Sequence, residues 1–288
     1  MKRIAFGVAL VLILSGCAAK TAAPPSATEL LIVPTVEPAS PTPPATPPPA
    51  VSSPAPKAKP KIGAAVTATV KTAITGAVVI DRQTGDQVVS ENADRQFHSG
   101  SLVKLLIAVD ALRRHPKDSN TISRVTDMIR YSDDGIASSF WVREGGTSIV
   151  GRMAKLMGLL NTEPPTPSTQ WGETLVTAND LTRVYDYILK QAAAGDRDVI
   201  VRAMASAAPK GSDGFNQSFG IMTAMDHWAV KQAWTNDDTS MSCHSTGLVG
   251  DGWRYTVIIL TEYPRSTPWS SATSAVTAAA KNIRSILS

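Results

Sequence analysis

The sequence predicts an α+β fold, in which strands from both ends of the chain form one antiparallel sheet beside a helical subdomain. Two short segments rich in β-branched residues, joined by a polar turn, stand near the start of the folded region. Three similar segments stand near the end, and helical patterns fill the region between, an order typical of α+β domains. The predicted strands cover residues 73–80, 87–89, 228–234, 243–247 and 254–263.

The helical subdomain is predicted from apolar residues that recur every three or four positions. The strongest of these segments covers residues 102–112 and begins after Ser99 and Gly100, which favour a helix start. Further predicted helices cover residues 121–130, 136–143, 147–157, 178–193, 198–207 and 272–287.

The start of the chain has the pattern of a lipoprotein signal peptide. Lys2 and Arg3 precede an apolar run at 4–14, which is too short for a membrane-spanning helix of about 20 residues. The sequence LSGC at 14–17 then matches a lipobox, whose cysteine accepts a diacylglyceryl group. We predict that Cys17 carries acyl chains such as palmitate and anchors the chain in the lipid bilayer, at the extracytoplasmic face of the cell membrane. The alternative is an ordinary signal peptide in which the cysteine has no role.

A proline-rich segment follows the signal peptide. Thirteen of the twenty prolines lie between Pro24 and Pro60, mixed with alanine, serine and threonine. Such a segment buries too little apolar surface to offset chain entropy, so we predict a disordered, extended spacer. The chain is thus divided into a signal peptide at 1–16, a lipid anchor and linker at 17–61, and a folded domain at 62–288.

The net charge of +4 does not point to a nucleic-acid partner. The predicted signal peptide carries two of those charges and the linker the other two, so residues 62–288 are nearly neutral. A nucleic-acid-binding domain carries its basic residues on the fold itself. The two cysteines are Cys17 and Cys243, and because lipidation takes the first, no disulfide is predicted.

Lys104 is an unusual residue in the predicted helix at 102–112, because its near neighbours are all apolar. A helix that is apolar on every side is buried, and a buried lysine needs a partner. Ser101 lies three residues earlier, so the two side chains share a face of the helix. A desolvated lysine has a lowered pKa and can accept a proton from an adjacent hydroxyl, which makes Ser101 a candidate nucleophile. The alternative is a lysine that extends its amine to solvent beside a helix-capping serine.

Two motifs resemble those of class A β-lactamases and penicillin-binding transpeptidases. Residues 97–104 carry the S-x-x-K pattern at Ser101 and Lys104, and residues 128–134 carry a variant of S-D-N about thirty residues later. The resemblance covers most of residues 62–288 in the right order. It implies a β-lactamase/transpeptidase-like fold and a ligand such as a cell-wall peptide or a β-lactam.

The resemblance also implies roles for individual residues. Ser101 would be the acylated nucleophile, Lys104 its base, and Ser132 a proton relay toward the leaving nitrogen. Lys231 would stand where the K-T-G lysine faces a substrate carboxylate. The backbone amides of Ser101 and of a residue near Ala233 would form the oxyanion hole.

The sequence departs from the family pattern at three places. Asp134 replaces an asparagine that helps to hold substrate, and a carboxylate there would repel an anionic ligand. Gln232 and Ala233 replace the threonine and glycine of K-T-G. The glutamate loop E-x-x-L-N, which supplies the deacylation base, is absent, since neither Glu163 nor Glu173 fits it. Without a positioned base, an acyl-enzyme would lose about 10²–10⁴-fold in hydrolysis rate.

A second resemblance, to actinobacterial lipoproteins of the LppW type, rests on residues 132–135, 230–234 and 245–250. Together these features favour a degenerate domain that binds a cell-wall ligand or a protein partner with little turnover. The alternative is a slow serine hydrolase, of β-lactamase or D-Ala-peptidase type, that forms an acyl-enzyme on Ser101. Nothing in the sequence predicts an oligomeric state.

No cofactor or metal site is predicted, because the four histidines lack the spacing of metal ligands and are expected in loops or caps. The histidines are His98, His115, His227 and His244. Cys243 beside His244 is not expected to act as a pair, since adjacent residues on a strand point to opposite faces. Three tryptophans are expected to pack in the core or on strands rather than to line a cleft. They are Trp228, Trp234 and Trp253.

Overall fold

The computed structural model describes residues 60–288. The predicted signal peptide, the lipidation site at Cys17 and nearly all of the predicted linker lie outside the described residues. Within the described part, no helix is long and apolar enough to cross a membrane. The described residues form an α+β domain, which confirms the predicted fold class.

The centre of the domain is a five-stranded antiparallel sheet with the strand order β2-β1-β7-β6-β5. Its N-terminal strand β1 pairs with the C-terminal strand β7 over their whole lengths, so the two ends of the described chain meet in the sheet, as predicted. A separate two-stranded sheet joins β3 to β4. The strands are β1 (Ile74–Asp81), β2 (Gln87–Glu91), β3 (Phe97–His98), β4 (Leu175–Val176), β5 (Trp228–Asn236), β6 (Ser240–Val249) and β7 (Tyr255–Pro264).

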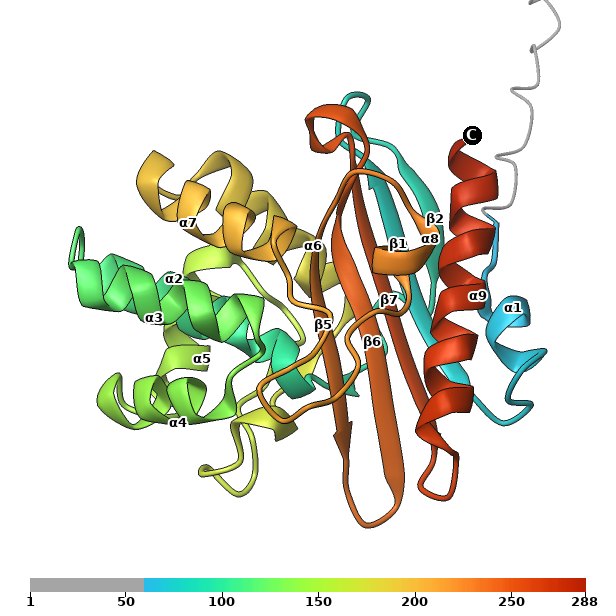
Figure 1. Cartoon of the computed structure of the whole chain (residues 1–288), viewed down its shortest axis with the longest axis horizontal. Helices are drawn as coiled ribbons and strands as arrows, with labels where there is room; N and C mark the ends of the chain where they lie inside the picture. The colour runs from blue at the N-terminus through green and yellow to red at the C-terminus, as the bar shows by residue number, and fades with distance from the viewer. Residues whose placement is uncertain (1–59) are drawn as a thin grey trace, which may run out of the picture. The chain divides into compact units, whose positions relative to one another are not determined.

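The strands are apolar on both faces because the sheet lies between two layers of helix. On β7, Val257 and Ile259 join one core cluster, while Ile258 and Leu260 join the other. This alternation follows from the two-residue period of a strand. Figure 1 shows α9 and α1 against one face and a larger group of helices against the other.

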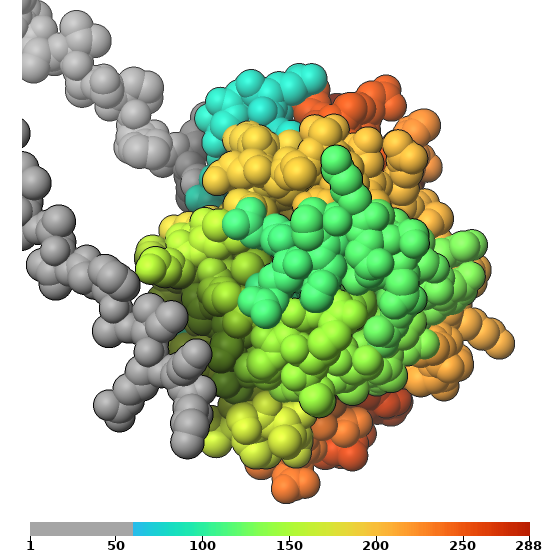
Figure 2. Space-filling view, turned by 90° about the vertical axis from the view of Figure 1, so that its left-hand side faces the viewer, coloured from blue at the N-terminus to red at the C-terminus, as the bar shows by residue number. Residues whose placement is uncertain are grey.

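The larger helical layer carries the residues of interest. Figure 2 faces this layer, with α7 in gold above the green helices. The helices are α1 (Gly63–Thr67), α2 (Val103–Arg114), α3 (Ser119–Arg130), α4 (Asp134–Arg143), α5 (Ser148–Met157), α6 (Ala178–Lys190), α7 (Ala194–Ala205), α8 (Ile221–Ala224) and α9 (Trp269–Leu287). Short 3₁₀ turns cover Gly100–Leu102, Trp171–Glu173 and Asp251–Trp253.

Helix α2 is the central helix of this layer. Its first ten residues, 103–112, are all buried, as the apolar sequence predicts. The apolar ones pack in the same core cluster as residues from α3, α4, α6 and the sheet. Lys104 is therefore enclosed on every side, with none of its surface exposed.

Several predicted boundaries were wrong. The helix predicted at 178–193 ends at Lys190, and the next one begins four residues earlier than predicted, at Ala194. The alanines at 192–194 fit either helix, so the pattern could not divide them. The short elements α1, α8, β3 and β4 were not predicted, since pieces of two to five residues carry too little periodicity.

Candidate active site

Ser101 lies in the 3₁₀ turn that leads into α2. The preceding Gly100 has a φ of +48°, a left-handed conformation that costs glycine little. This bend sets Ser101 so that its Oγ accepts a hydrogen bond of 2.9 Å from Lys104 Nζ. The serine–lysine contact expected from the spacing is therefore present.

Ser132 meets this pair from the connection between α3 and α4. Its φ of +53° is unusual for a residue with a side chain and is held by the contacts around it. Its hydroxyl donates to Ser101 Oγ at 2.8 Å, and its carbonyl accepts from Lys104 Nζ at 2.7 Å. The two motifs, about thirty residues apart in the sequence, thus form one hydrogen-bonded network.

Lys231 reaches the same network from β5, the edge strand next to the 3₁₀ turn that contains Ser101. Its Nζ donates to Ser132 Oγ at 2.9 Å and to the Gln232 carbonyl at 2.7 Å. Burial lowers the pKa of Lys231 well below its ordinary value, and the nearby charge of Lys104 lowers it further. The side chain of Gln232 points elsewhere, since its Nε2 donates to the carbonyls of Gln217 and Phe219.

Asp134, the first residue of α4, forms an ion pair with Lys104. The distance from Asp134 Oδ1 to Lys104 Nζ is 2.5 Å. Burial lowers the pKa of Lys104, and the Asp134 carboxylate opposes this shift. The two partners differ in environment, because the lysine side chain is fully buried whereas 63% of the aspartate side chain is exposed. Asp134 thus presents negative charge at the surface above the Ser101 hydroxyl.

A cleft of about 270 Å³ opens over Ser101. Its lining comes from the 3₁₀ turn before α2, the start of α4, the segment before β4 and the end of β5. The lining residues are Gly100, Ser101, Asp134, Gln170, Trp171, Gly172, Glu173, Trp234, Thr235 and Asn236. A larger cavity of about 490 Å³, which includes Arg82, Arg183 and Lys190, contains none of the predicted catalytic residues. We therefore take the smaller cleft as the candidate site.

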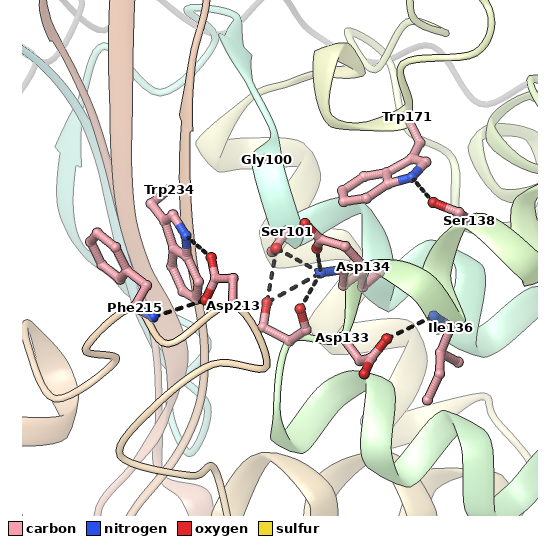
Figure 3. Close-up of polar contacts among 12 residues, drawn as sticks. Gly100, Ser101, Asp133, Asp134, Ile136, Ser138, Trp171, Asp213, Phe215 and Trp234 are labelled. Atoms are coloured by element: carbon pink, nitrogen blue, oxygen red, sulfur yellow. Dashed lines mark hydrogen bonds and ion pairs between the residues drawn. The ribbon is translucent and has the colours of Figure 1, made fainter.

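Two tryptophans border the cleft from opposite sides of Ser101 (Figure 3). The ring of Trp171 lies 4.9 Å from Lys104 Nζ, and its Nε1 donates to Ser138 Oγ at 3.1 Å. Trp234 stacks on Phe215 with the ring centroids 4.4 Å apart. The expectation that Trp234 would only pack was wrong, because it also lines the cleft.

His98 lies beside two carboxylates at the edge of the cleft. Its Nδ1 is 2.7 Å from Glu173 Oε2, and its Nε2 is 3.8 Å from Asp237 Oδ2. Among the described residues these side chains form the one group of three or more metal-ligating types with atoms within 4.8 Å of one another. The carboxylate of Asp237 already accepts hydrogen bonds from Thr239 and Ser240, which lower its pKa to about 2. His98 therefore lies on a strand facing two acids, and not in a loop as expected.

The remaining predicted residues lie near the cleft or away from it. Ala233 is fully buried on β5 and packs near Gly100, while the cleft is lined by the next residues along that strand. Glu163 accepts a hydrogen bond from Gln96 and does not line the cleft. Cys243 and His244 face opposite cores, as predicted, since Cys243 belongs to one cluster and His244 contacts Phe97 of the other.

Sequence comparison connects the chain to named relatives. Lipoprotein LppW of Mycobacterium tuberculosis and that of Mycobacterium bovis are each 35% identical to it over 206 residues. The match covers 68% of this chain and 65% of the relatives, so it spans slightly less than two thirds of their length. No family model matches the chain.

Structural comparison identifies the fold. A class A β-lactamase from Bacteroides cellulosilyticus superposes with a TM-score of 0.64 and 13% identity, covering 78% of this chain and 96% of that one. A class A β-lactamase from Mycobacterium abscessus superposes with a TM-score of 0.62 and 15% identity, covering 79% of this chain and 100% of that one. A mutant of PBP-A, solved as an acyl-enzyme with penicillin G, superposes with a TM-score of 0.61 and 13% identity, covering 78% of this chain and 95% of that one. This chain therefore has the class A β-lactamase and penicillin-binding protein fold, and its sequence is similar to lipoprotein LppW over part of that protein's length.

Proposed function

We propose that this chain is a cell-envelope lipoprotein whose domain binds a cell-wall ligand or a protein partner in the Ser101 cleft with little turnover. The anchor would be the acylated Cys17, with the domain on the extracytoplasmic side of the membrane. The lipobox at 14–17 and the naming of the LppW relatives as lipoproteins support this part.

The ion pair between Asp134 and Lys104 is the observation that most strongly supports low turnover. Lys104 would serve as the base for Ser101 only in its neutral form. The carboxylate at 2.5 Å favours the protonated form and so opposes the effect of burial. The pKa of Lys104 is still lowered, but less than burial alone would lower it, so less of the neutral amine is present to take the proton of the Ser101 hydroxyl and attack by this serine would be slower.

The acidic side chains that line the cleft also have interaction partners. Hydrolysis of an acyl-enzyme needs a base that activates water beside the ester. Among the lining residues the carboxylates are those of Asp134 and Glu173, and each has a cationic or imidazole partner. The ring of Trp171 covers Lys104 on the cleft side. These contacts support slow deacylation in addition to slow acylation.

The alternative is a serine hydrolase that forms an acyl-enzyme on Ser101. The intact relay favours it, because Ser132 Oγ lies 2.8 Å from Ser101 Oγ and accepts from Lys231 Nζ at 2.9 Å. Such a relay can pass a proton to the leaving nitrogen as the C–N bond breaks and the Ser101 ester forms.

One experiment separates the two functions. The full chain, purified in detergent, is incubated with a fluorescent penicillin and followed by intact mass over several hours. We expect less than one tenth of the protein to carry an adduct. A stoichiometric adduct that disappears in Ser101→Ala would favour the hydrolase instead.

The anchor has its own test. Radiolabelled palmitate supplied to cells that express the chain should enter the wild type and be absent from Cys17→Ala. Cys243→Ala is the matched control, since its thiol is fully buried and should leave labelling unchanged. Equal labelling of wild type and Cys17→Ala would refute the anchor.

A further inference from the structure

The ionisable side chains that line the Ser101 cleft are acidic. Of its lining residues, Asp134 and Glu173 are the ones that ionise, and both are acids. Asp213, which is exposed, accepts from Nε1 of the lining Trp234 at 2.9 Å and so adds a third carboxylate at the border. Asp237 lies close to both His98 and Glu173, with its Oδ2 3.8 Å from His98 Nε2.

The basic residues nearby balance these acids only in part, since Lys104 pairs with Oδ1 of Asp134 while 63% of the Asp134 side chain stays exposed. Lys104 has none of its surface exposed and Lys231 has 1%, so neither ammonium group can meet a ligand directly. Each already donates to protein oxygens, Lys104 to Asp134 and Lys231 to Ser132 among them. His98, if protonated, offers one charge against its two neighbouring carboxylates.

The aromatic walls add to the preference for a cation. Trp171 and Trp234 lie on opposite sides of Ser101 and both line the cleft. The faces of indole rings carry partial negative charge and attract ammonium and guanidinium groups. One face of Trp234 is stacked on Phe215 and Trp171 already lies over Lys104, so the rings are held in fixed positions.

We infer that the Ser101 cleft selects a ligand with an ammonium or guanidinium group, held between Asp134, Glu173 and the two indole rings. A ligand that brings a carboxylate to this place, as a penicillin or a peptide with a free C-terminus does, is disfavoured. This inference rests on the proposed function, since it names the class of ligand that the cleft binds.

The test compares three peptides of similar size and different charge. Acetyl-lysyl-D-alaninamide, acetyl-norleucyl-D-alaninamide and acetyl-glutamyl-D-alaninamide are titrated calorimetrically into the full chain in detergent. We expect the lysyl peptide to bind at least tenfold more tightly than the norleucyl peptide, and the glutamyl peptide to bind most weakly. Raising the salt concentration should weaken the lysyl peptide selectively, because salt screens exposed charges.

Two variants and one control place the effect in the cleft. Asp134→Asn and Glu173→Gln should each reduce the lysyl-to-norleucyl ratio at least threefold. Asp86→Asn, which removes an exposed carboxylate from the β1–β2 turn, should leave the ratio unchanged. Equal affinities, a preference for the glutamyl peptide, unaltered ratios in both cleft variants, or no binding of the lysyl peptide would each overturn the inference.

The same samples also report on the proposed function. Turnover is measured separately, by the rate at which fluorescent penicillin labels Ser101. Rapid labelling together with a preserved preference for the lysyl peptide would refute low turnover and support a cationic ligand. Slow labelling without any charge preference would refute the ligand class and keep low turnover.

Discussion

Asp134 Oδ1 lies 2.5 Å from Lys104 Nζ, so the residue that departs from the family motif contacts the residue that the motif needs as its base. The sequence suggested that Asp134 would act on a ligand. The structure shows that it also contacts the hydrogen-bonded network around Ser101, and its carboxylate opposes the pKa shift that burial gives to Lys104. The Asp134 side chain thus adds a carboxylate to the cleft and also holds Lys104 in an ion pair.

Replacing Asp134 with asparagine should make Ser101 more reactive. Without the carboxylate, burial alone acts on Lys104, and its pKa should fall further. A lower pKa makes the neutral amine of Lys104 more abundant at neutral pH. We expect Asp134→Asn to form the penicillin adduct at least tenfold faster than wild type, measured by intact mass.

Two controls accompany this prediction. The double variant Asp134→Asn/Ser101→Ala should form no adduct, which would assign the reaction to this serine. Asp86→Asn should behave as the wild type does. If Asp134→Asn reacts no faster than wild type, the ion pair is not what limits acylation.

Replacing Trp171 with alanine should expose Lys104. The indole ring lies 4.9 Å from Lys104 Nζ on the side of the cleft, so its removal opens a path for solvent. We expect acetic anhydride to modify Lys104 at least tenfold faster in Trp171→Ala, measured by peptide mass spectrometry. The exposed Lys155 is the internal reference and should react at one rate in both proteins. Unchanged protection of Lys104 would show that Trp171 is not its cover.

Asp180 should stabilise the segment that leads to Trp171. Its buried carboxylate accepts from the amides of Leu160 and Asn161 at 2.9 and 2.8 Å and pairs with Arg183. Truncation leaves these donors without their acceptor, which costs about 1–3 kcal/mol for each buried group. We expect Asp180→Ala to lower the free energy of unfolding by about 3 kcal/mol in urea titrations.

The matched control lies on the same helix. Asp186 pairs with Lys190, but both side chains are about half exposed, at 45% and 60%. Exposed pairs contribute about 0–1 kcal/mol, so Asp186→Ala should change stability little. Similar losses in the two variants would mean that burial of the carboxylate does not decide the effect.

His244 should make the domain less stable in acid. Its Nε2 faces the His98 carbonyl at 2.8 Å and its Nδ1 accepts from the Thr261 amide at 3.1 Å, so the neutral ring satisfies both contacts. Burial lowers the pKa of His244 to about 4 from an ordinary value of 6.5. The unfolded chain therefore binds the extra proton first as the pH falls, and stability decreases from about pH 6.5 down to about pH 4.

The magnitude and the control follow from this shift. A difference of about 2.5 pKa units corresponds to about 3 kcal/mol lost between pH 7 and pH 4. Because other groups also titrate in this range, the effect is taken as the difference between wild type and His244→Gln, by urea unfolding at each pH. Parallel curves for the two proteins would exclude His244 as the source.

The parts of the site that sequence could predict are those set by local geometry. Ser101 and Lys104 lie three residues apart at a helix start, so their contact follows from the helical repeat. The burial of Lys104 follows from its apolar neighbours. Ser132 and Lys231 were predicted from the family motifs, and the structure brings both into the same network.

The parts that sequence could not predict depend on contacts between distant segments. His98, Glu173 and Asp237 come from three elements far apart in the chain, and residue spacing says nothing of their proximity. Trp171 belongs to a segment without periodic pattern, so its position over Lys104 depends on how that segment folds back. Asp134 was named as a site residue, but its pairing with Lys104 depends on how the start of α4 is oriented toward α2.

Cys243 gives the described domain a built-in probe of its own opening. It is fully buried, has no disulfide partner among the described residues, and burial raises the pKa of its thiol. A thiol-specific reagent can therefore reach it only when β6 separates from its neighbours. The rate of labelling at Cys243 should equal the opening rate when the reagent reacts faster than the domain closes, and should be proportional to the open population when it reacts more slowly. Reductants should leave the midpoint of unfolding unchanged. The folded state can thus be followed through a single native atom, the sulfur of Cys243, without an engineered cysteine.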